Sequence, residues 1–228
     1  MSTVRLLSWN IHGTFGRNPR YDLAGVVELI DRWQPHIVAL QEVDSRRQSD
    51  VDPFEFLQRE LGEHGIGAKS ILTEDGGGYG QMLISRWPLS ATEIHDISFP
   101  EREPRRAIAT CIDTPSGPLR VVATHLGLSI HERRAQTQTL MALANDPQIA
   151  TVIMGDFNDW FWPGSVRSVL SRAFPARTRF RTFPSRCPML RLDRIYCRPH
   201  SAFVRCFTDR AGRLYSDHLP VIADVMPQ

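Results

Sequence analysis

The sequence predicts an α/β fold in which two β-sheets pack face to face and helices cover their outer surfaces. The first observation is a pattern that occurs twice, in which a buried strand, a helix and a second buried strand carry polar residues at the strand ends. These polar residues are Asn10 and Glu42 in the first half and His125 and Asp156 in the second. The second observation is spacing, because the interval from Asn10 to His125 differs by a single residue from the interval from Glu42 to Asp156. The repeat therefore predicts that the four side chains converge at one rim.

The composition is that of an ordinary globular protein. With 42% hydrophobic and 23% charged residues, the chain has enough apolar material for a sizeable core. No linker rich in Pro, Gly or Ser divides it, so we expect a single domain over residues 1–228. A strand pattern begins almost directly after Met1, and no apolar run approaches the roughly 20 residues that a membrane span needs. We therefore expect a cytoplasmic protein without a membrane span, most simply a monomer.

The first half contains strands and helices in alternation. We expect strands at residues 5–8, 37–40 and 81–84, and helices at 23–33 and from 53 to a stop at 62 or 65. Asp22 has the chemistry of an N-cap, and Pro53 suits the first position of a helix. Both helices carry apolar residues at the spacing of an amphipathic helix. The glycines at 76–80 predict a turn, because no Gly-Lys-Ser/Thr and no helix follow them.

The second half begins with a hairpin and ends in three strands. We expect strands at 107–114, 119–124, 150–154, 192–196, 203–207 and 221–225, with helices at 131–145 and about 163–174. The run at 150–154 looks buried on both faces and is halted at Gly155. Beyond it, Asp156 and Asn158 lie two apart and so share one face. Open α/β sheets commonly bind ligands at such carboxyl ends of strands, which makes this stretch a candidate site.

Polar residues of the kinds used in hydrolysis collect at the predicted strand ends. The set is Asn10, Glu42, His125, Asp156, Asn158, Asp193, Asp217 and His218. No Gly-x-Ser-x-Gly elbow and no cysteine beside a histidine is present, so covalent catalysis has little support. Carboxylate and amide oxygens without clustered cysteines favour a hard cation, Mg²⁺ or Mn²⁺, over zinc. The two histidines are available for charge stabilisation or proton transfer.

Positive charge is concentrated between residues 167 and 213, a segment with many arginines whose only acidic residues are Asp193 and Asp209. Part of this bias reflects a general preference for arginine, because Lys69 is the only lysine in the chain. A cationic face suits an anionic, phosphate-bearing partner. A solvated surface without a partner is the alternative interpretation.

Seven short motifs follow one another along the chain. They are W-N-I-H-G, Q-E-V, Y-G-Q-M-L-I-S-R-W-P, T-H-L, G-D-F-N-D, L-D-R-I-Y and S-D-H-L-P-V. In this order they resemble the endonuclease/exonuclease/phosphatase superfamily, also called DNase I-like, over essentially the whole chain. The resemblance implies a four-layer α/β/β/α sandwich of two mixed β-sheets. It also implies metal-dependent hydrolysis of a phosphoester by water.

The resemblance further implies how the metal and the water are held. Glu42 matches the principal metal ligand, with Asn10 and Asp217 near the ion. Asp156 matches the residue that orients or deprotonates the attacking water. Asn158 matches the amide that helps to hold water and phosphate.

The histidines receive their expected roles in the same way. His218 matches the histidine that stabilises the negatively charged transition state, and Asp193 matches its carboxylate partner. His125 fits the second catalytic histidine of the family. In-line attack by water would then be supported by the metal charge and by donation from the two rings.

Two positions depart from the pattern of the superfamily. Gln81 stands where an asparagine is common, so a substrate contact could be shifted. Arg194 follows Asp193 where AP endonucleases usually have an aromatic residue, whereas inositol polyphosphate 5-phosphatases and tyrosyl-DNA phosphodiesterases have D-R-I. This mildly disfavours abasic-site repair. Arg194 could bind a phosphate or brace Tyr196, and the sequence does not decide between them.

Three functions compete at this stage. The leading hypothesis is a hydrolase of phosphodiesters or phosphomonoesters on a small or lipid-linked substrate, with Arg106, Arg194 and Trp160 as candidate substrate contacts. The second is a nuclease or DNA-repair enzyme, in which the Arg-rich quarter follows the backbone and aromatic residues 160–162 stack on bases, unless they simply pack. The third is a catalytically silent binding module, which is disfavoured because every expected polar position is filled.

Overall fold

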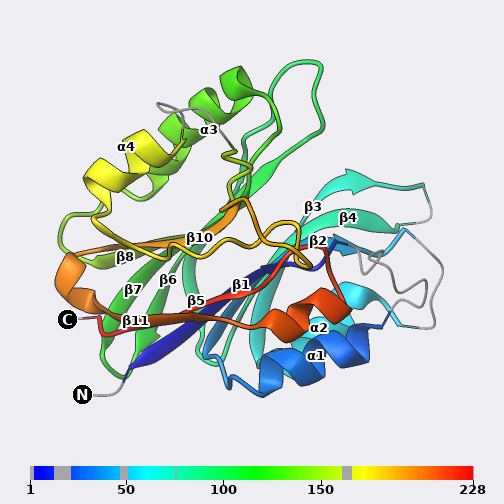
Figure 1. Ribbon diagram of the computed structural model, residues 1–228, viewed down its shortest axis with the longest axis horizontal. Coiled ribbons are helices and arrows are strands. Elements are labelled where there is room, and N and C mark those ends of the chain that lie inside the picture. The colour runs from blue at the N-terminus through cyan, green and yellow to red at the C-terminus, as the bar shows by residue number, and fades with distance from the viewer. Residues whose placement is uncertain (1–2, 13–21, 47–50, 75, 161–165, 228) are drawn as a thin grey trace.

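Two mixed β-sheets of six strands each pack against one another, and helices cover the outer face of each sheet (Figure 1). The four-layer α/β/β/α order expected from the sequence is confirmed. The structure is a computed structural model that describes residues 3–12, 22–46, 51–74, 76–160 and 166–227. Within these ranges no helix has the length and apolar character needed to cross a membrane.

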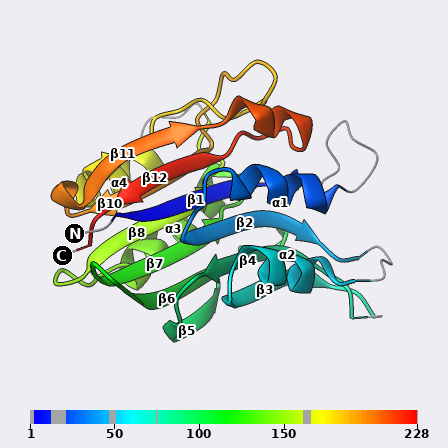
Figure 2. The same cartoon turned by 90° about the horizontal axis from the view of Figure 1, so that it is seen from below.

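The first sheet draws strands from both ends of the chain and has the order β11-β12-β1-β2-β4-β3 (Figure 2). Its strands are β1 (Val4–Asn10), β2 (Ile37–Asp44), β3 (His64–Leu72), β4 (Gly78–Ser85), β11 (Phe203–Thr208) and β12 (Val221–Val225). Helices α1 (Leu23–Asp31) and α2 (Pro53–Leu61) lie on its outer face. Short 3₁₀ helices, η2 (His200–Ala202) and η3 (Arg210–Leu214), flank β11.

The second sheet comes from the middle of the chain and has the order β5-β6-β7-β8-β10-β9. Its strands are β5 (Leu89–Asp96), β6 (Arg106–Thr114), β7 (Gly117–His125), β8 (Ala150–Asp156), β9 (Ala176–Arg177) and β10 (Asp193–Arg198). Helices α3 (Ile130–Leu143) and α4 (Val166–Ala173) cover it from the other side of the molecule (Figure 1).

The two sheets repeat one topology, as the spacing of the polar residues predicts. In the first sheet β1 and β2 are parallel and joined through α1, and in the second β7 and β8 are parallel and joined through α3. All flanking pairs are antiparallel and follow in the same order on both sides. The ends of β1 and β7 are therefore equivalent, and so are the ends of β2 and β8.

Strand alternation divides the apolar residues into three clusters. Inward-facing residues such as Leu6, Val121 and Val152 form the core between the sheets. Outward-facing residues of the first sheet, Trp9 among them, pack under α1 and α2, and those of the second sheet, Tyr196 among them, pack under α3 and α4. Each fully buried large side chain contributes about 1.5–3 kcal/mol, so the strands that carry the polar rim are anchored firmly from both faces.

The helices begin where the sequence indicates. The side chain of Asp22 accepts a hydrogen bond from Gly25 N, and Pro53 occupies the first turn of α2 behind the N-cap Asp52. Helix α3 starts with a capping box that the sequence analysis missed. Residues 161–165, which include the first part of the helix expected at about 163–174, lie outside the described residues.

Three expectations need correction. Strands β3 and β5 were not expected, because their apolar residues alternate poorly and glycines interrupt β3. The turn expected at 76–80 is partly strand, because β4 already begins at Gly78. Gly155 does not halt β8, which continues to Asp156. At this glycine a Cβ would lie 1.9 Å from Thr124 O, so a close approach of neighbouring strands, and not a strand end, requires it.

Candidate active site

Polar side chains from both sheets meet where β1, β2, β7 and β8 end. Asn10 Nδ2 donates to Glu42 Oε1 at 2.9 Å and to Asp156 Oδ2 at 3.0 Å. His125 Nε2 lies 3.7 Å from Asp156 Oδ2 and 3.9 Å from Glu42 Oε1. The convergence of these four residues, expected from the repeat, is confirmed.

Simple alternation explains why most of these side chains face one another. Leu6 and Met154 point into the core between the sheets. Because side chains on a strand alternate between its two faces, Asn10 and Asp156 point to this same side. The same rule, counted from Ile195, turns Asp193 inward. The polar rim is therefore the continuation of the inter-sheet core beyond its last apolar residues.

Glu42 reaches the rim by a different device. Leu40 packs under the helices, so plain alternation would turn Glu42 outward as well. The pairing of β2 with β4 shifts register between Gln41 and Val43, and Glu42 has a φ of 58°. Such a β-bulge re-aims one side chain, and here it brings the carboxylate to Asn10. The positive φ of a non-glycine residue costs about 1 kcal/mol or more, which the surrounding strands must offset.

Asp193 and His218 form a buried pair beside Asp156. His218 Nδ1 lies 2.9 Å from Asp193 Oδ2 and 3.8 Å from Asp156 Oδ2. Trp9 Nε1 donates to His218 O and Ser216 Oγ accepts from His218 N, so the backbone of this loop is fixed. Burial lowers the pKa of His218, but the two carboxylates outweigh it and raise the pKa to about 10. The ring is therefore cationic at neutral pH.

His125 is held in the opposite charge state. Arg105 Nη1 lies 3.1 Å from His125 Nδ1, while Arg105 also pairs with Glu103 at 3.0 Å. Burial and then the charge of Arg105 lower the pKa of His125 to about 3, so this ring is neutral at neutral pH. Asn158 Nδ2 donates to Leu126 O at 2.8 Å and lies 3.3 Å from His125 Nε2. The sequence analysis did not single out Arg105.

His12 is a second residue that the sequence analysis left out of the site, although it follows Asn10 in the first motif. His12 Nδ1 lies 3.1 Å from Glu42 Oε2 and 3.6 Å from Asp217 Oδ1. Its backbone N–H donates to Asn10 Oδ1 at 2.9 Å. The hydrogen bond with Glu42 raises the pKa of His12 above its usual value. Two carboxylates, one from strand β2 and one from the loop before β12, thus converge on one nitrogen.

The carboxylates of the rim differ in proton affinity. Burial favours the protonated form of Glu42, but His12, His125 and Asn10 outweigh it and hold its pKa well below the usual range. Burial and the charge of Asp193 raise the pKa of Asp156 to about 6. One acid is therefore firmly ionised, and the other can exchange a proton near neutral pH.

Comparison with known proteins identifies the fold and the family. A sequence model described as "Endonuclease/Exonuclease/phosphatase family" matches residues 7–218. The chain belongs to this family. The Escherichia coli protein YbhP, which is described as uncharacterized, is 32% identical over 249 residues, covering 98% of this chain and 96% of its own. Proteins of the endonuclease/exonuclease/phosphatase family are generally metal-dependent phosphoesterases.

Solved structures show the same fold at lower sequence identity. A family member from Beutenbergia cavernae superposes with a TM-score of 0.80 at 20% identity, covering 99% of this chain and 72% of that one. The human Nocturnin catalytic domain, solved with a bound sulfate anion, gives a TM-score of 0.73 at 20% identity, covering 99% of this chain and 94% of that one. These likenesses support the DNase I-like sandwich and nothing finer.

Cavities flank the rim of this endonuclease/exonuclease/phosphatase family member. One of about 250 Å³ lies on the side of Glu42 and His12 and includes Arg46 and Tyr79. Another of about 340 Å³ lies on the side of Asp217. A larger groove of about 870 Å³, lined mostly by charged residues near α1 and α2, shares no residue with the rim. We therefore place the site at the rim and not in this larger groove.

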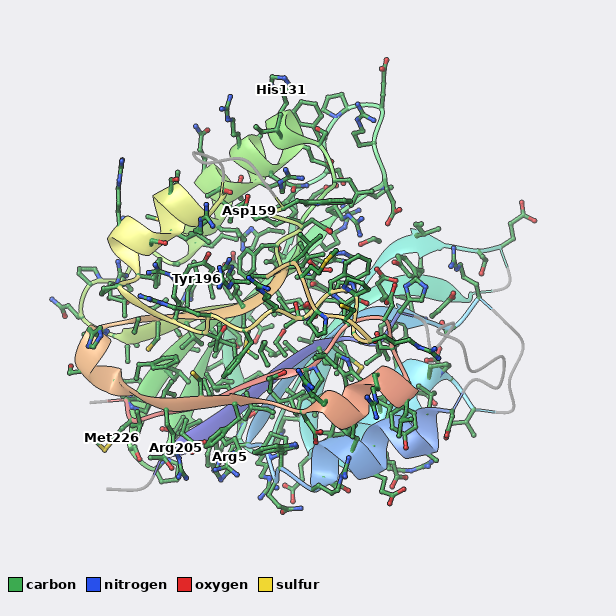
Figure 3. All side chains as sticks on the ribbon, in the orientation of Figure 1. Arg5, His131, Asp159, Tyr196, Arg205 and Met226 are labelled. Atoms are coloured by element: carbon green, nitrogen blue, oxygen red, sulfur yellow. The ribbon has the colours of Figure 1, made fainter. Side chains whose placement is uncertain are left out.

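Among the described residues, the three candidate substrate contacts make no hydrogen bond or ion pair with the polar cluster, although Arg106 and His125 line one small cavity. Arg106 is tied to Asp96 and to Ser98 Oγ. Arg194 is buried beside Tyr196 on the face of β10 that α4 covers, the side on which Asp159 and Tyr196 lie in Figure 3. Trp160 is 44% exposed just beyond β8. The residues next to it, Phe161 and Trp162, lie outside the described residues. Of the arginines considered, Arg105 rather than Arg106 or Arg194 contacts His125.

Proposed function

We propose that this protein is a metal-dependent hydrolase that uses water to cleave a phosphodiester or phosphomonoester of a small or lipid-linked substrate. The observation that carries the proposal is the position of Asn10, whose single Nδ2 binds carboxylates of both sheets, Glu42 and Asp156. The Asn10 amide thereby links Glu42, which is suited to binding a metal, with Asp156, which is suited to activating a water. The family, whose members generally cleave phosphoesters, supports the same reaction class.

The donor set fits a hard divalent cation. Glu42 Oε2 and Asp217 Oδ1 both approach His12 Nδ1, so two anionic oxygens are available at one place. Within the described residues Asp217 Oδ1 is buried and has no hydrogen-bond partner, as expected of an oxygen that a cation would satisfy. We assign Glu42 and Asp217 as ligands, with Asn10 beside them. Bound there, Mg²⁺ or Mn²⁺ would neutralise phosphate charge and act as a Lewis acid.

A second group of possible ligand atoms exists at the rim but suits a cation less well. Atoms of Asp156, Asp193 and His218 lie within 4.8 Å of one another, and all three residues are buried. His218 Nδ1 is already bound to Asp193, and the ring is cationic because its pKa is raised to about 10. A cationic imidazolium repels a metal ion, so we assign this triad to proton transfer and charge stabilisation.

The remaining side chains supply the chemistry around the attacking water. Asp156, whose pKa is raised to about 6, is matched to accept a proton from water near neutral pH. His218 can donate to a phosphate oxygen as negative charge develops, and Asp193 holds that ring in place. Asn158 and His125 border the same space and can orient water and phosphate.

The experiment measures metal binding and hydrolysis on the same variants. Glu42→Gln removes the ionised ligand, and Glu28→Gln, on the exposed face of α1, is the matched control. Substrates are bis-p-nitrophenyl phosphate, p-nitrophenyl phosphate, a lysophospholipid, supercoiled DNA and a single-stranded oligonucleotide. We expect Glu42→Gln to lower the rate by about 10²–10³-fold and to abolish Mn²⁺ binding in calorimetry, with Glu28→Gln unchanged.

The substrate panel separates the proposed function from its alternative. Preference for the small esters or the lipid supports the proposal, whereas preference for DNA supports a nuclease. Hydrolysis that persists in excess EDTA and in Glu42→Gln would contradict the metal assignment. A folded wild-type protein that binds Mn²⁺ and cleaves none of these compounds would contradict the proposed reaction.

A further inference from the structure

The arginines of the 167–213 segment do not form one continuous surface. Several are committed to structural contacts within the described part of the chain. Arg198 donates to two carbonyls just beyond α3, Arg205 pairs with Asp224, and Arg191 donates to Arg179 O. Arg205 lies with Arg5 near Met226, at the end of the molecule away from the site (Figure 3). These three arginines of the segment thus have structural roles.

Arg186 and Arg213 differ from these. Both side chains are exposed, and their guanidinium groups make no hydrogen bond or ion pair with any residue that the structure describes. Both line the cavity of about 340 Å³ beside Asp217. We name it the Arg186–Arg213 cavity; its other lining residues are Pro184, Ser185, Cys187 and Ser216. Two arginines whose guanidinium groups have no described partner therefore line one hollow next to the proposed metal ligand.

The wall of this cavity is built rigidly onto the active site. Ser185 N donates to Asp217 O at 2.6 Å, and Ser185 Oγ donates to Ser216 O at 2.7 Å. Ser216 Oγ in turn donates to Asn10 O at 2.7 Å. Phe183, just ahead of the wall, packs on the ring of His218 with centroids 4.9 Å apart. A group bound in the cavity would thus be held at a fixed position relative to the rim.

The chemistry of the cavity indicates its occupant. Two arginines at one hollow suit a phosphate, which guanidinium groups bind by charge-assisted hydrogen bonds. Pro184 and Cys187 add an apolar wall for the body that carries this phosphate. Asp217 is the carboxylate in the lining, and its Oδ1 approaches His12 and His218, so it faces the metal side. The volume lies within the roughly 300–1,000 Å³ of small-molecule sites.

We propose that the Arg186–Arg213 cavity binds a second phosphate, on the part of the substrate that does not react, while the scissile phosphate lies at the rim. The proposal rests on the proposed function and narrows its substrate to phosphoesters that carry a further phosphate a short distance away. Such a phosphate occurs in a small bisphosphorylated compound and in the next unit of a nucleic-acid strand. The scattered arginines elsewhere favour the small compound.

The first test compares ligands that differ by a single phosphate. Binding of thymidine 3′,5′-bisphosphate and of thymidine 5′-phosphate is measured by calorimetry with Mg²⁺, on wild type and on the double variant Arg186→Gln/Arg213→Gln. Arg134→Gln/Arg172→Gln, at exposed positions of α3 and α4, is the matched control. We expect the second phosphate to tighten binding at least about tenfold in wild type and control, and the double variant to lose this gain. Equal affinity for both ligands in wild type would overturn the proposal.

The second test uses turnover and separates the two proposals. Substrates are the 4-nitrophenyl ester of thymidine 5′-phosphate with and without a 3′-phosphate, and an oligonucleotide. We expect the double variant to lose the advantage of the 3′-phosphate while cleaving the other ester within about twofold of wild type. Tighter bisphosphate binding without any turnover would support phosphate binding in the cavity and contradict the proposed hydrolase function. If the double variant affected cleavage of the oligonucleotide alone, the cavity would bind a nucleic-acid strand, and the assignment of a small substrate would be overturned.

Discussion

Arg105 Nη1 lies 3.1 Å from His125 Nδ1, inside the buried border of the site. A guanidinium has only donors, so Nδ1 must accept and the single proton of the neutral ring is on Nε2. Asn158 Nδ2, 3.3 Å from this nitrogen, then donates to Leu126 O and not to the ring. Nε2 points toward Asp156 and Glu42. The arginine thereby fixes both the tautomer and the charge of the histidine. It acts on the site through His125 and is a positioning residue.

The first prediction follows from this contact. In Arg105→Gln the pKa of His125 should rise, because the cation that lowers it is removed, and the Nε2–H tautomer should no longer be enforced. We expect kcat to fall about tenfold or more with a small change in KM. Nitrogen NMR of the His125 ring reads the tautomer directly. Arg106→Gln is the neighbouring control, and an unchanged tautomer with a raised KM would mean that Arg105 acts on the substrate instead.

The second prediction concerns the pH dependence of stability. The pKa of His218 is raised from 6.5 to about 10, so the folded state holds its proton more tightly than the unfolded state. Its stabilising effect is fully present below pH 6.5 and is lost as the pH rises toward 10. In EDTA, the unfolding free energy of wild type should fall over this interval relative to that of His218→Asn. Urea denaturation measures it, with His131→Asn on the exposed face of α3 as control. Parallel curves for wild type and His218→Asn would refute the pairing.

The third prediction separates the framework from the site. Asp224 is fully buried and binds Arg5 Nε at 2.7 Å and Arg205 Nε at 2.7 Å. Burial raises the pKa of Asp224, but the two arginines outweigh it and hold the pKa below the usual value. Asp224→Asn should cost about 2 kcal/mol, most of it above pH 4, whereas Arg205→Gln, with a mostly exposed side chain, should cost less than about 1 kcal/mol. Denaturation at pH 7 and pH 3 checks both values. The rate per folded molecule should not change, and a selective loss of rate would contradict this assignment.

Much of the architecture could be predicted because it follows from local patterns. The four polar residues at the ends of β1, β2, β7 and β8 could be located from apolar runs, and their convergence followed from the equal spacing. Strands β3 and β5 could not be predicted, since they lie at sheet edges where one face is solvated and alternation is weak. Elements that show neither the two-residue period of a strand nor the 3.6-residue period of a helix were missed.

The site was predictable to the same degree. The motifs identified residues that lie at strand ends, yet the β-bulge at Glu42 depends on the register with β4 and has no sequence signature. The contacts of His12 and Arg105 likewise depend on side chains that come from other strands and loops. Arg194 illustrates the reverse error, because strand alternation from Asp193 already places it on the opposite face of β10. Along β6 the same count turns Arg106, like Ile108, toward the space between the sheets, so it would not have identified Arg105.

The fourth prediction tests how closely the strands of the site must approach. A Cβ at Gly155 would lie 1.9 Å from Thr124 O, and the φ of Gly155 is 149°. Gly155→Ala should therefore cost more than about 2 kcal/mol, because either β7 and β8 separate or the backbone rotates. Gly76→Ala is the matched control, since Gly76 also has a positive φ, of 85°, but its Cβ position has no atom within 4 Å from the described residues beyond its chain neighbours. Its cost should stay near 1 kcal/mol, the value for unfavourable backbone geometry alone. Denaturant unfolding compares the two. Equal costs would mean that conformation, and not the approach of β7, requires glycine beside Asp156.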